Sequence, residues 1–168
     1  ALVKGDPSSR RRFLDELLVS LVPRHAATRS DYDRVLKQRN ALLKSARAGK
    51  FTSGHEATLD VWDQHMARAG AELLHARLEL VERLRPHLNN AYAQLTDGSK
   101  NAGAIYRSTL QGALEDDGAA PASAAAVETA GPAEDLRQLS VDELTERYVQ
   151  AFASSRRKEL ERGISLVG

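Results

Sequence analysis

One apolar repeat, unusually long for a single domain, limits the folds open to this chain of 168 residues. Apolar residues recur every three or four positions over residues 59–88, as along one face of a helix, and the pattern continues to about Leu95. A helix of about 40 residues is about 60 Å long, twice the width of a small domain, so part of it must project or bend. Pro86 is the expected bend. The repeat consists of Leu59, Trp62, Met66, Ala69, Leu73, Ala76, Leu80, Leu84 and Leu88.

The start of this long helix carries its own signal. Ser53 and Glu56 have the spacing of a capping box, which predicts that the helix begins there. Trp62 and Met66 lie on the apolar stripe, and we expect them to be packing residues rather than parts of a ligand site.

Two shorter helical patterns come first in the chain. Residues 7–22 and 25–48 each carry apolar side chains at helical spacing, and Pro23 separates them because proline cannot continue a helix. The turn at 49–54 is bracketed by glycines and is short enough to make the next helix antiparallel to the second. We therefore predict an antiparallel hairpin arm over residues 25–76, with a coiled-coil-like seam.

The helical pattern is interrupted after residue 100. Residues 104–110, "AIYRSTL", alternate as a short strand does, and the terminal "GISLVG" is the other strand candidate. Because a lone strand needs a sheet, we expect any sheet to lie outside this chain. Residues 115–135 are rich in alanine and acidic residues and contain no basic residue, which predicts a flexible surface insertion; Asp116 and Asp117 within it are expected to be solvated, not catalytic.

A last helix completes the predicted fold. Ser140 and Glu143 have capping-box spacing, and the helix is expected to end near Gly163. Its predicted inner side holds Val141, Leu144, Tyr148, Phe152 and Leu160. The fold class is thus mainly α: a helical bundle with a projecting antiparallel hairpin, with at most one or two short strands, and residues 1–168 form a single helical lobe.

Charge is distributed unevenly along the chain, although the net charge is only +1. Residues 1–50 hold 12 Lys and Arg against 5 Asp and Glu, whereas residues 101–168 hold 7 against 11. A basic first third attracts polyanions and can supply phosphate contacts that do not depend on base sequence. The alternative is that exposed helices are merely decorated with basic residues. The candidate DNA-binding residues are Arg10, Arg11, Arg12, Arg34, Lys37 and Lys44.

Duplex DNA is the favoured form of nucleic acid. Binding of single strands uses exposed aromatic rings on which bases stack. Phe13 and Tyr32 are the aromatic residues of the basic third, and both are expected on apolar faces.

The patterns of the common catalytic and metal sites are absent from the sequence. The chain has no cysteine, which excludes disulfides and thiolate metal sites and suits a reducing cytoplasm. No apolar run approaches the roughly 20 residues that cross a bilayer, so no membrane partner is expected. The glycine-rich residues 97–103 lack P-loop spacing and predict a turn. We expect no catalytic residue, no metal and no cofactor in this segment; the histidines, which lack metal-ligand spacing, are His25, His55, His65, His75 and His87.

The opening stretch resembles the signature of a known family. "LVKGDPSSRRRFLD", residues 2–15, is similar to the signature of the RecF family, bacterial recombination-mediator ATPases related to the SMC proteins. Residues 34–44, 62–73 and 80–92 resemble the family's later helices, and "IYRSTL" and "ERGISLVG" resemble its return to the ATPase sheet, all in family order. The signature positions are Gly5, Asp6, Pro7, Arg10, Arg11, Phe13, Leu14 and Asp15.

This resemblance implies a function for a longer protein. RecF-like proteins have an ABC-type ATPase head that is split in sequence around an inserted helical lobe, and this chain resembles that lobe. ATP and magnesium are implied for the full-length protein only. The family is cytoplasmic and bacterial; it binds DNA at gaps, forms a homodimer on ATP, and works with RecO and RecR to load recombinase in recombinational repair and the SOS response.

Two interpretations of the basic residues and of the whole chain stay open. Arg10 and Arg11 would either fix the lobe against the ATPase head or contact DNA directly, and Arg12 is expected to face solvent. The chain itself is either the arm of a DNA-repair ATPase or an autonomous helical adaptor that binds another protein through its hairpin.

Overall fold

The computed structural model describes residues 6–50, 52–96, 105–110 and 136–168. These residues confirm the helical bundle and contain no strand. In chain order the elements are α1 (Pro7–Leu21), α2 (His25–Arg47), α3 (Ser53–Leu95), the short 3-10 helix η1 (Leu136–Gln138) and α5 (Val141–Arg162).

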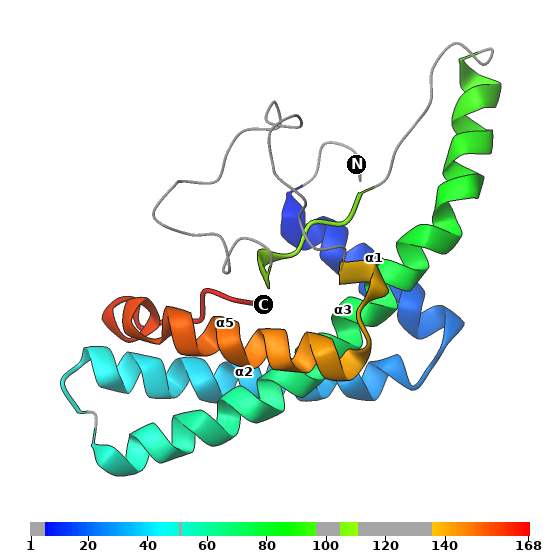
Figure 1. The fold of residues 1–168 in the computed structure, drawn as a ribbon. Helices are drawn as coiled ribbons and strands as arrows, with labels where there is room; N and C mark the ends of the chain where they lie inside the picture. The colour runs from blue at the N-terminus through cyan, green and yellow to red at the C-terminus, as the bar shows by residue number, and fades with distance from the viewer. Residues whose placement is uncertain (1–5, 51, 97–104, 111–135) are drawn as a thin grey trace.

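The long helices α2, α3 and α5 pack together and form the body of the bundle (Figure 1). α2 and α3 run antiparallel to each other, and α5 packs along both, parallel to α2. α1 packs against α3 and α2 near the start of α2. The alanine-rich stretch 115–135, predicted as an insertion, lies outside the described residues.

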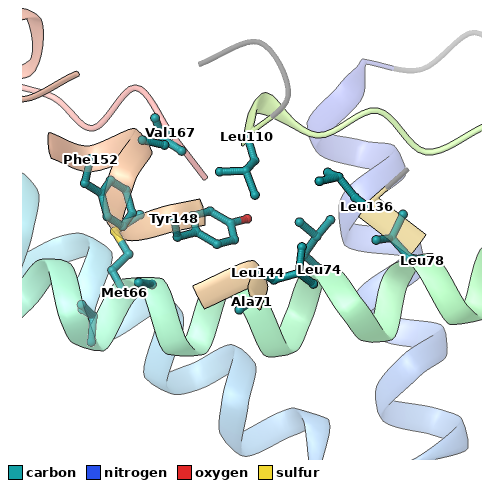
Figure 2. Packing of buried hydrophobic residues seen from close by; sticks show 13 residues of the cluster. Met66, Ala71, Leu74, Leu78, Leu110, Leu136, Leu144, Tyr148, Phe152 and Val167 are labelled. Carbon is teal, nitrogen blue, oxygen red and sulfur yellow. The ribbon is translucent and has the colours of Figure 1, made fainter. Parts of the chain in front are cut away.

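The main hydrophobic core lies between α3 and α5 and is completed by short segments (Figure 2). Leu110, Leu136 and Val167 close it from the side opposite α3, so distant parts of the sequence contribute to one cluster. Met66 is fully buried in this core and Trp62 packs against it, which confirms their predicted packing role.

The first helix has the predicted cap but a different buried face. Asp6 accepts hydrogen bonds from the hydroxyls of Ser8 (2.5 Å) and Ser9 (2.8 Å) and from their backbone N–H groups (2.7 and 3.2 Å), and these bonds hold the pKa of Asp6 below its ordinary value. Phe13 was expected on the apolar face, but this ring is 41% exposed. The buried face of α1 is centred on Asp15 and Leu18, which turns Phe13 away from α3.

The third helix extends over 43 residues, as its apolar repeat predicts. The expected cap at Ser53 and Glu56 is wrong: Thr52 is the N-cap, and its backbone N–H donates to Nδ1 of His55 at 3.0 Å. α3 continues through Pro86 and changes direction toward its C-terminal end (Figure 1). All of its residues from Pro86 to Leu95 are exposed.

The two predicted strands are not formed in the described residues. Residues 105–108 have no regular secondary structure and are followed by a helical turn at Thr109 and Leu110, and residues 163–168 are irregular. The segments still meet, because the N–H of Gly168 donates to Oγ1 of Thr109 (3.0 Å), which also lies 3.2 Å from the carbonyl of Gly168. Because the side-chain hydroxyl of Thr109 makes these contacts, and not a series of backbone hydrogen bonds between the two segments, they do not form a sheet.

The last helix confirms the predicted capping box and end. The N–H of Glu143 donates to Oγ of Ser140 (3.2 Å), and the N–H of Ser140 donates to the Glu143 carboxylate (2.7 Å), which lowers the pKa of Glu143. The helix ends at Gly163, whose φ of 71° favours glycine. Its buried side includes two residues that the predicted list lacked, Ala151 and the charged Glu159, both fully buried.

Candidate nucleic-acid interface

The three consecutive arginines of the first helix are all exposed. Nε of Arg12 lies 2.9 Å from Glu16, one helical turn later on the same helix. Arg10 and Arg11 form no ion pair with any other residue that the structure describes. Their charges are therefore available to a partner outside these residues.

The basic residues predicted on the second helix share its outer face. Arg34, Lys37 and Lys44 follow at steps of three and seven residues, and all three are exposed. Val35 and Leu43 occupy the opposite, buried face of α2. Arg34 is partly neutralised, because its Nη2 lies 2.9 Å from the carboxylate of Asp31.

A pocket of about 730 Å³ lies between α1 and α2 and includes two of these predicted residues. Arg34 and Lys37 line it together with Arg29, so three of the lining side chains are cationic. Glu16 and Asp33 also line the pocket, and Nε of Arg29 lies 4.0 Å from the carboxylate of Asp15, so the cations of the lining are partly balanced by carboxylates. Lys44 is not among the lining residues. Of the predicted DNA-binding residues, the pocket thus brings together only Arg34 and Lys37, and Arg10, Arg11 and Arg12 of α1 are not part of its lining.

A fully buried arginine, which we did not predict, lies on the other side of α2. Nε of Arg39 donates to Asp63 on α3 (2.6 Å), and its Nη2 donates to Glu159 on α5 (2.5 Å). Its guanidinium carbon is 4.6 Å from the centre of the Phe152 ring, a cation–π contact. Burial alone would lower the pKa of Arg39, but the hydrogen bonds to Glu159 and Asp63 more than offset it and raise that pKa.

The buried arginine also fixes the segment that follows α5. Nη1 of Arg39 donates to Oγ of Ser165 (2.8 Å), and the second carboxylate oxygen of Glu159 accepts from the N–H of Leu166 (2.7 Å). The side chain of Asn40 accepts from the N–H of Ser165 at 2.8 Å. Side chains of α2 and α5 therefore hold the course of residues 163–168. The sequence offered one signal for the burial of Arg39: its spacing of four residues from Val35 and from Leu43 places all three on the same face of α2, which is buried.

A second arginine anchors the first helix. Arg77 on α3 contacts both carboxylate oxygens of Asp15 through Nε (2.7 Å) and Nη2 (2.8 Å), and its Nη1 donates to the hydroxyl of Tyr106 at 3.1 Å. Burial would lower the pKa of Arg77, but the bond to Asp15 leads the contacts that raise it. Asp15 belongs to the signature-like stretch, so this part of the motif has a structural role within the helical bundle.

The described residues lack the features of metal sites and of membrane-spanning helices. They contain no group of three or more His, Cys, Asp and Glu side chains that could hold a metal ion. None of the helices described is both long and apolar enough to cross a bilayer. The glycine-rich residues 97–103, which we interpreted as a turn, lie outside the described residues.

Comparison with curated proteins identifies relatives that match every part of the chain. The chain is 83% identical over 168 residues to the DNA replication and repair protein RecF of Paenarthrobacter aurescens, and 82% identical to that of an Arthrobacter strain. It covers 42% of each of these proteins. The RecF protein of Rhodococcus erythropolis is 43% identical over 175 residues, with 40% of its length covered.

No protein-family model and no solved structure matches the chain. The chain spans about two fifths of the length of the curated relatives that it matches. The similarity includes the signature-like stretch at residues 2–15 and continues to the last residue, since the match covers 100% of the chain. From the motif, the helical order and the identity to RecF proteins over every residue of this chain, we conclude that the chain belongs to the RecF family.

Proposed function

We propose that this chain is the helical lobe of a DNA replication and repair protein, and that the exposed face of α1 and α2 contacts the phosphate backbone of DNA. The observation that carries the proposal is the common exposed face of Lys37 and Lys44, beside a pocket with three cationic side chains. Relatives named as DNA replication and repair proteins support it. The match to part of a longer protein favours this function over an autonomous adaptor.

The length of the basic face suits a duplex. Ten residues separate Arg34 from Lys44, a rise of about 15 Å along a helix. Over 15 Å of its axis, duplex DNA presents about nine phosphate charges. Long, flexible lysine and arginine side chains on such a face can follow the backbone without reading bases, so the contact is independent of sequence.

The remaining activities belong, in this proposal, to the full-length protein. There the lobe is attached to an ATPase head that binds ATP and magnesium, forms a homodimer on ATP, and binds DNA at gaps. RecO and RecR are its proposed partners in loading recombinase for recombinational repair and the SOS response. Residues 25–76 serve as the arm of this lobe, and no residue described here is assigned to the hydrolysis of ATP.

A salt series tests the DNA contact. The full-length protein is titrated with a fluorescent gapped duplex at several salt concentrations, as wild type and as Arg34→Gln/Lys37→Gln/Lys44→Gln. Removing one cation that binds a phosphate makes the dependence of log K on log salt shallower by about 0.9, so the slope of the triple variant is expected to be shallower by about two to three. Arg83→Gln/Arg107→Gln removes exposed cations elsewhere and is the control. An unchanged slope in the triple variant contradicts the proposal.

The same titration separates the two roles of Arg10 and Arg11. If they contact DNA, Arg10→Ala/Arg11→Ala makes the salt dependence shallower and leaves stability unchanged. If they fix the lobe against the ATPase head, the variant lowers the unfolding temperature of the full-length protein or uncouples ATP from DNA binding.

A further inference from the structure

Two helices that are far apart in sequence end side by side at one end of the bundle. The C-terminal ends of α2 and α5 lie next to each other at the left of Figure 1. Nη1 of Arg47, in the last turn of α2, donates to the backbone carbonyl of Arg162, in the last turn of α5, at 3.3 Å. A Cβ atom on Gly163 would lie 3.1 Å from Cδ of Arg47, which confirms close packing at this end.

This arrangement gathers positive charge. Arg47, Lys50 and Arg162 are exposed, and we call these three residues the bundle-end cluster. No acidic residue occurs between Arg34 and His55 in the sequence. None of the three cluster residues forms an ion pair within the described part of the chain.

The acidic residues of the last turns of α5 do not cancel this charge. Glu159 is fully buried and holds Arg39, while Glu161 lies 3.1 Å from Nε of Arg157 on its own helix. Each of these carboxylates already has a cationic partner. The excess of positive charge at this end of the bundle therefore comes from the bundle-end cluster, although residues 101–168 as a whole are more acidic than basic.

We propose that the bundle-end cluster is an additional phosphate-backbone contact, which extends the DNA-binding face of α2 around the end of the bundle onto α5. This inference rests on the proposed function of α1 and α2 in DNA binding. Lys44 lies one turn before Arg47 on α2, so the cluster continues the basic face of that helix. Arg162 adds a cation from residues 101–168, the more acidic part of the chain, in which the sequence predicts no DNA contact.

Basic residues in a last turn also interact with the helix dipole, and that role predicts a different result. A charge that acts only on the dipole changes the stability of its own helix and leaves the salt dependence of DNA binding unchanged. A phosphate contact changes the salt dependence, because binding releases counterions from DNA. The two roles are therefore separable in one set of variants.

The experiment uses the full-length protein and a gapped duplex at salt concentrations from low to physiological. Arg47→Gln/Lys50→Gln/Arg162→Gln is expected to bind roughly tenfold more weakly at low salt, with a slope of log K against log salt shallower by about two to three. Arg47→Lys/Arg162→Lys keeps the charges and is expected to restore the wild-type slope. Lys50→Gln, which changes a residue outside the helices, is expected to make the slope shallower by about one and tests the proposal if the triple variant does not fold.

Comparison with the α2 variant of the proposed function distinguishes the two failures. A normal slope in the bundle-end variants, together with a shallower slope in Arg34→Gln/Lys37→Gln/Lys44→Gln, overturns the bundle-end contact alone. Normal slopes in both sets overturn both proposals. A lowered unfolding temperature with an unchanged slope assigns the cluster to the helix dipoles and likewise overturns the proposal.

Discussion

Arg39 and Glu159, separated by 120 positions in the sequence, form an ion pair in which both side chains are fully buried. The pair joins α2 to α5, and Arg39 also reaches Asp63 on α3, so three helices meet at one guanidinium. A buried charge has lost its hydration, so it is costly in free energy unless a partner of opposite charge compensates for that loss. This contact fixes the relative positions of the three long helices.

Removal of one member of this pair is expected to be strongly destabilising. Glu159→Gln keeps the shape of the side chain but leaves Arg39 with one carboxylate fewer, and we expect a loss of about 3–5 kcal/mol in the free energy of unfolding. Urea unfolding followed by circular dichroism measures this loss. The matched control is Glu161→Gln, since Glu161 forms an exposed pair with Arg157, for which we expect about 0.5 kcal/mol or less. Equal effects of the two substitutions would contradict the assignment.

The anchor of the first helix makes a second prediction. Asp15→Asn removes the charge that pairs with Arg77 through two hydrogen bonds, so we expect a loss of about 3 kcal/mol. Arg77→Lys is expected to fail as a replacement, because an ammonium lacks the planar fork that fits both oxygens. Thermal unfolding provides the measurement. Asp31→Asn, at the exposed pair with Arg34, serves as the control and is expected to leave the unfolding temperature nearly unchanged.

Alkaline pH is expected to destabilise the fold through Tyr32. Burial raises the pKa of Tyr32 from 10.0 to about 12, so the folded state favours the neutral phenol. The resulting stability is fully present below pH 10 and is lost as the pH rises from 10 to 12; the difference in pKa corresponds to about 3 kcal/mol. Tyr32→Phe should therefore lose less stability over this range in urea unfolding.

The control for this pH dependence is Tyr92→Phe, because the Tyr92 ring is exposed near the end of α3. Its stability curve is expected to follow that of the unsubstituted chain. A residual fall in Tyr32→Phe is also expected, since burial raises the pKa of Tyr148 as well. If Tyr32→Phe loses as much stability between pH 10 and 12 as the unsubstituted chain, the burial of the Tyr32 hydroxyl is not the cause.

The end of the last helix depends on one glycine. Gly163 has φ of 71°, and a Cβ there would lie 3.1 Å from Cδ of Arg47, so Gly163→Ala is expected to cost about 1–2 kcal/mol. Gly54→Ala is the matched control, because Gly54 lies in α3 and a Cβ there meets no atom closer than 3.8 Å. That control is expected to be neutral or stabilising by up to about 1 kcal/mol. Thermal unfolding of both variants distinguishes backbone strain from a general effect of the added methyl group.

The sequence by itself determined the helices and most of their limits. The bounds of α1, α2, α3 and α5 follow from apolar spacing and from local signals such as Asp6 before Pro7 and Gly163 after α5. These signals act within one or two turns, where the 3.6-residue period of the helix decides which side chains are neighbours. The same locality explains the one error at a helix start, where Thr52 and His55 supply a cap one residue earlier than Ser53.

The tertiary structure alone decided which faces became buried and which charges became neighbours. Phe13 is exposed because Asp15 turns toward Arg77, and two segments with strand-like sequences meet through Thr109 and Gly168 without forming a sheet. The buried Arg39–Glu159 pair and the meeting of Arg47 with Arg162 join residues more than 100 positions apart. No local pattern specifies such contacts, because they depend on how α2, α3 and α5 pack, and burial then sets the energetic value of each charge.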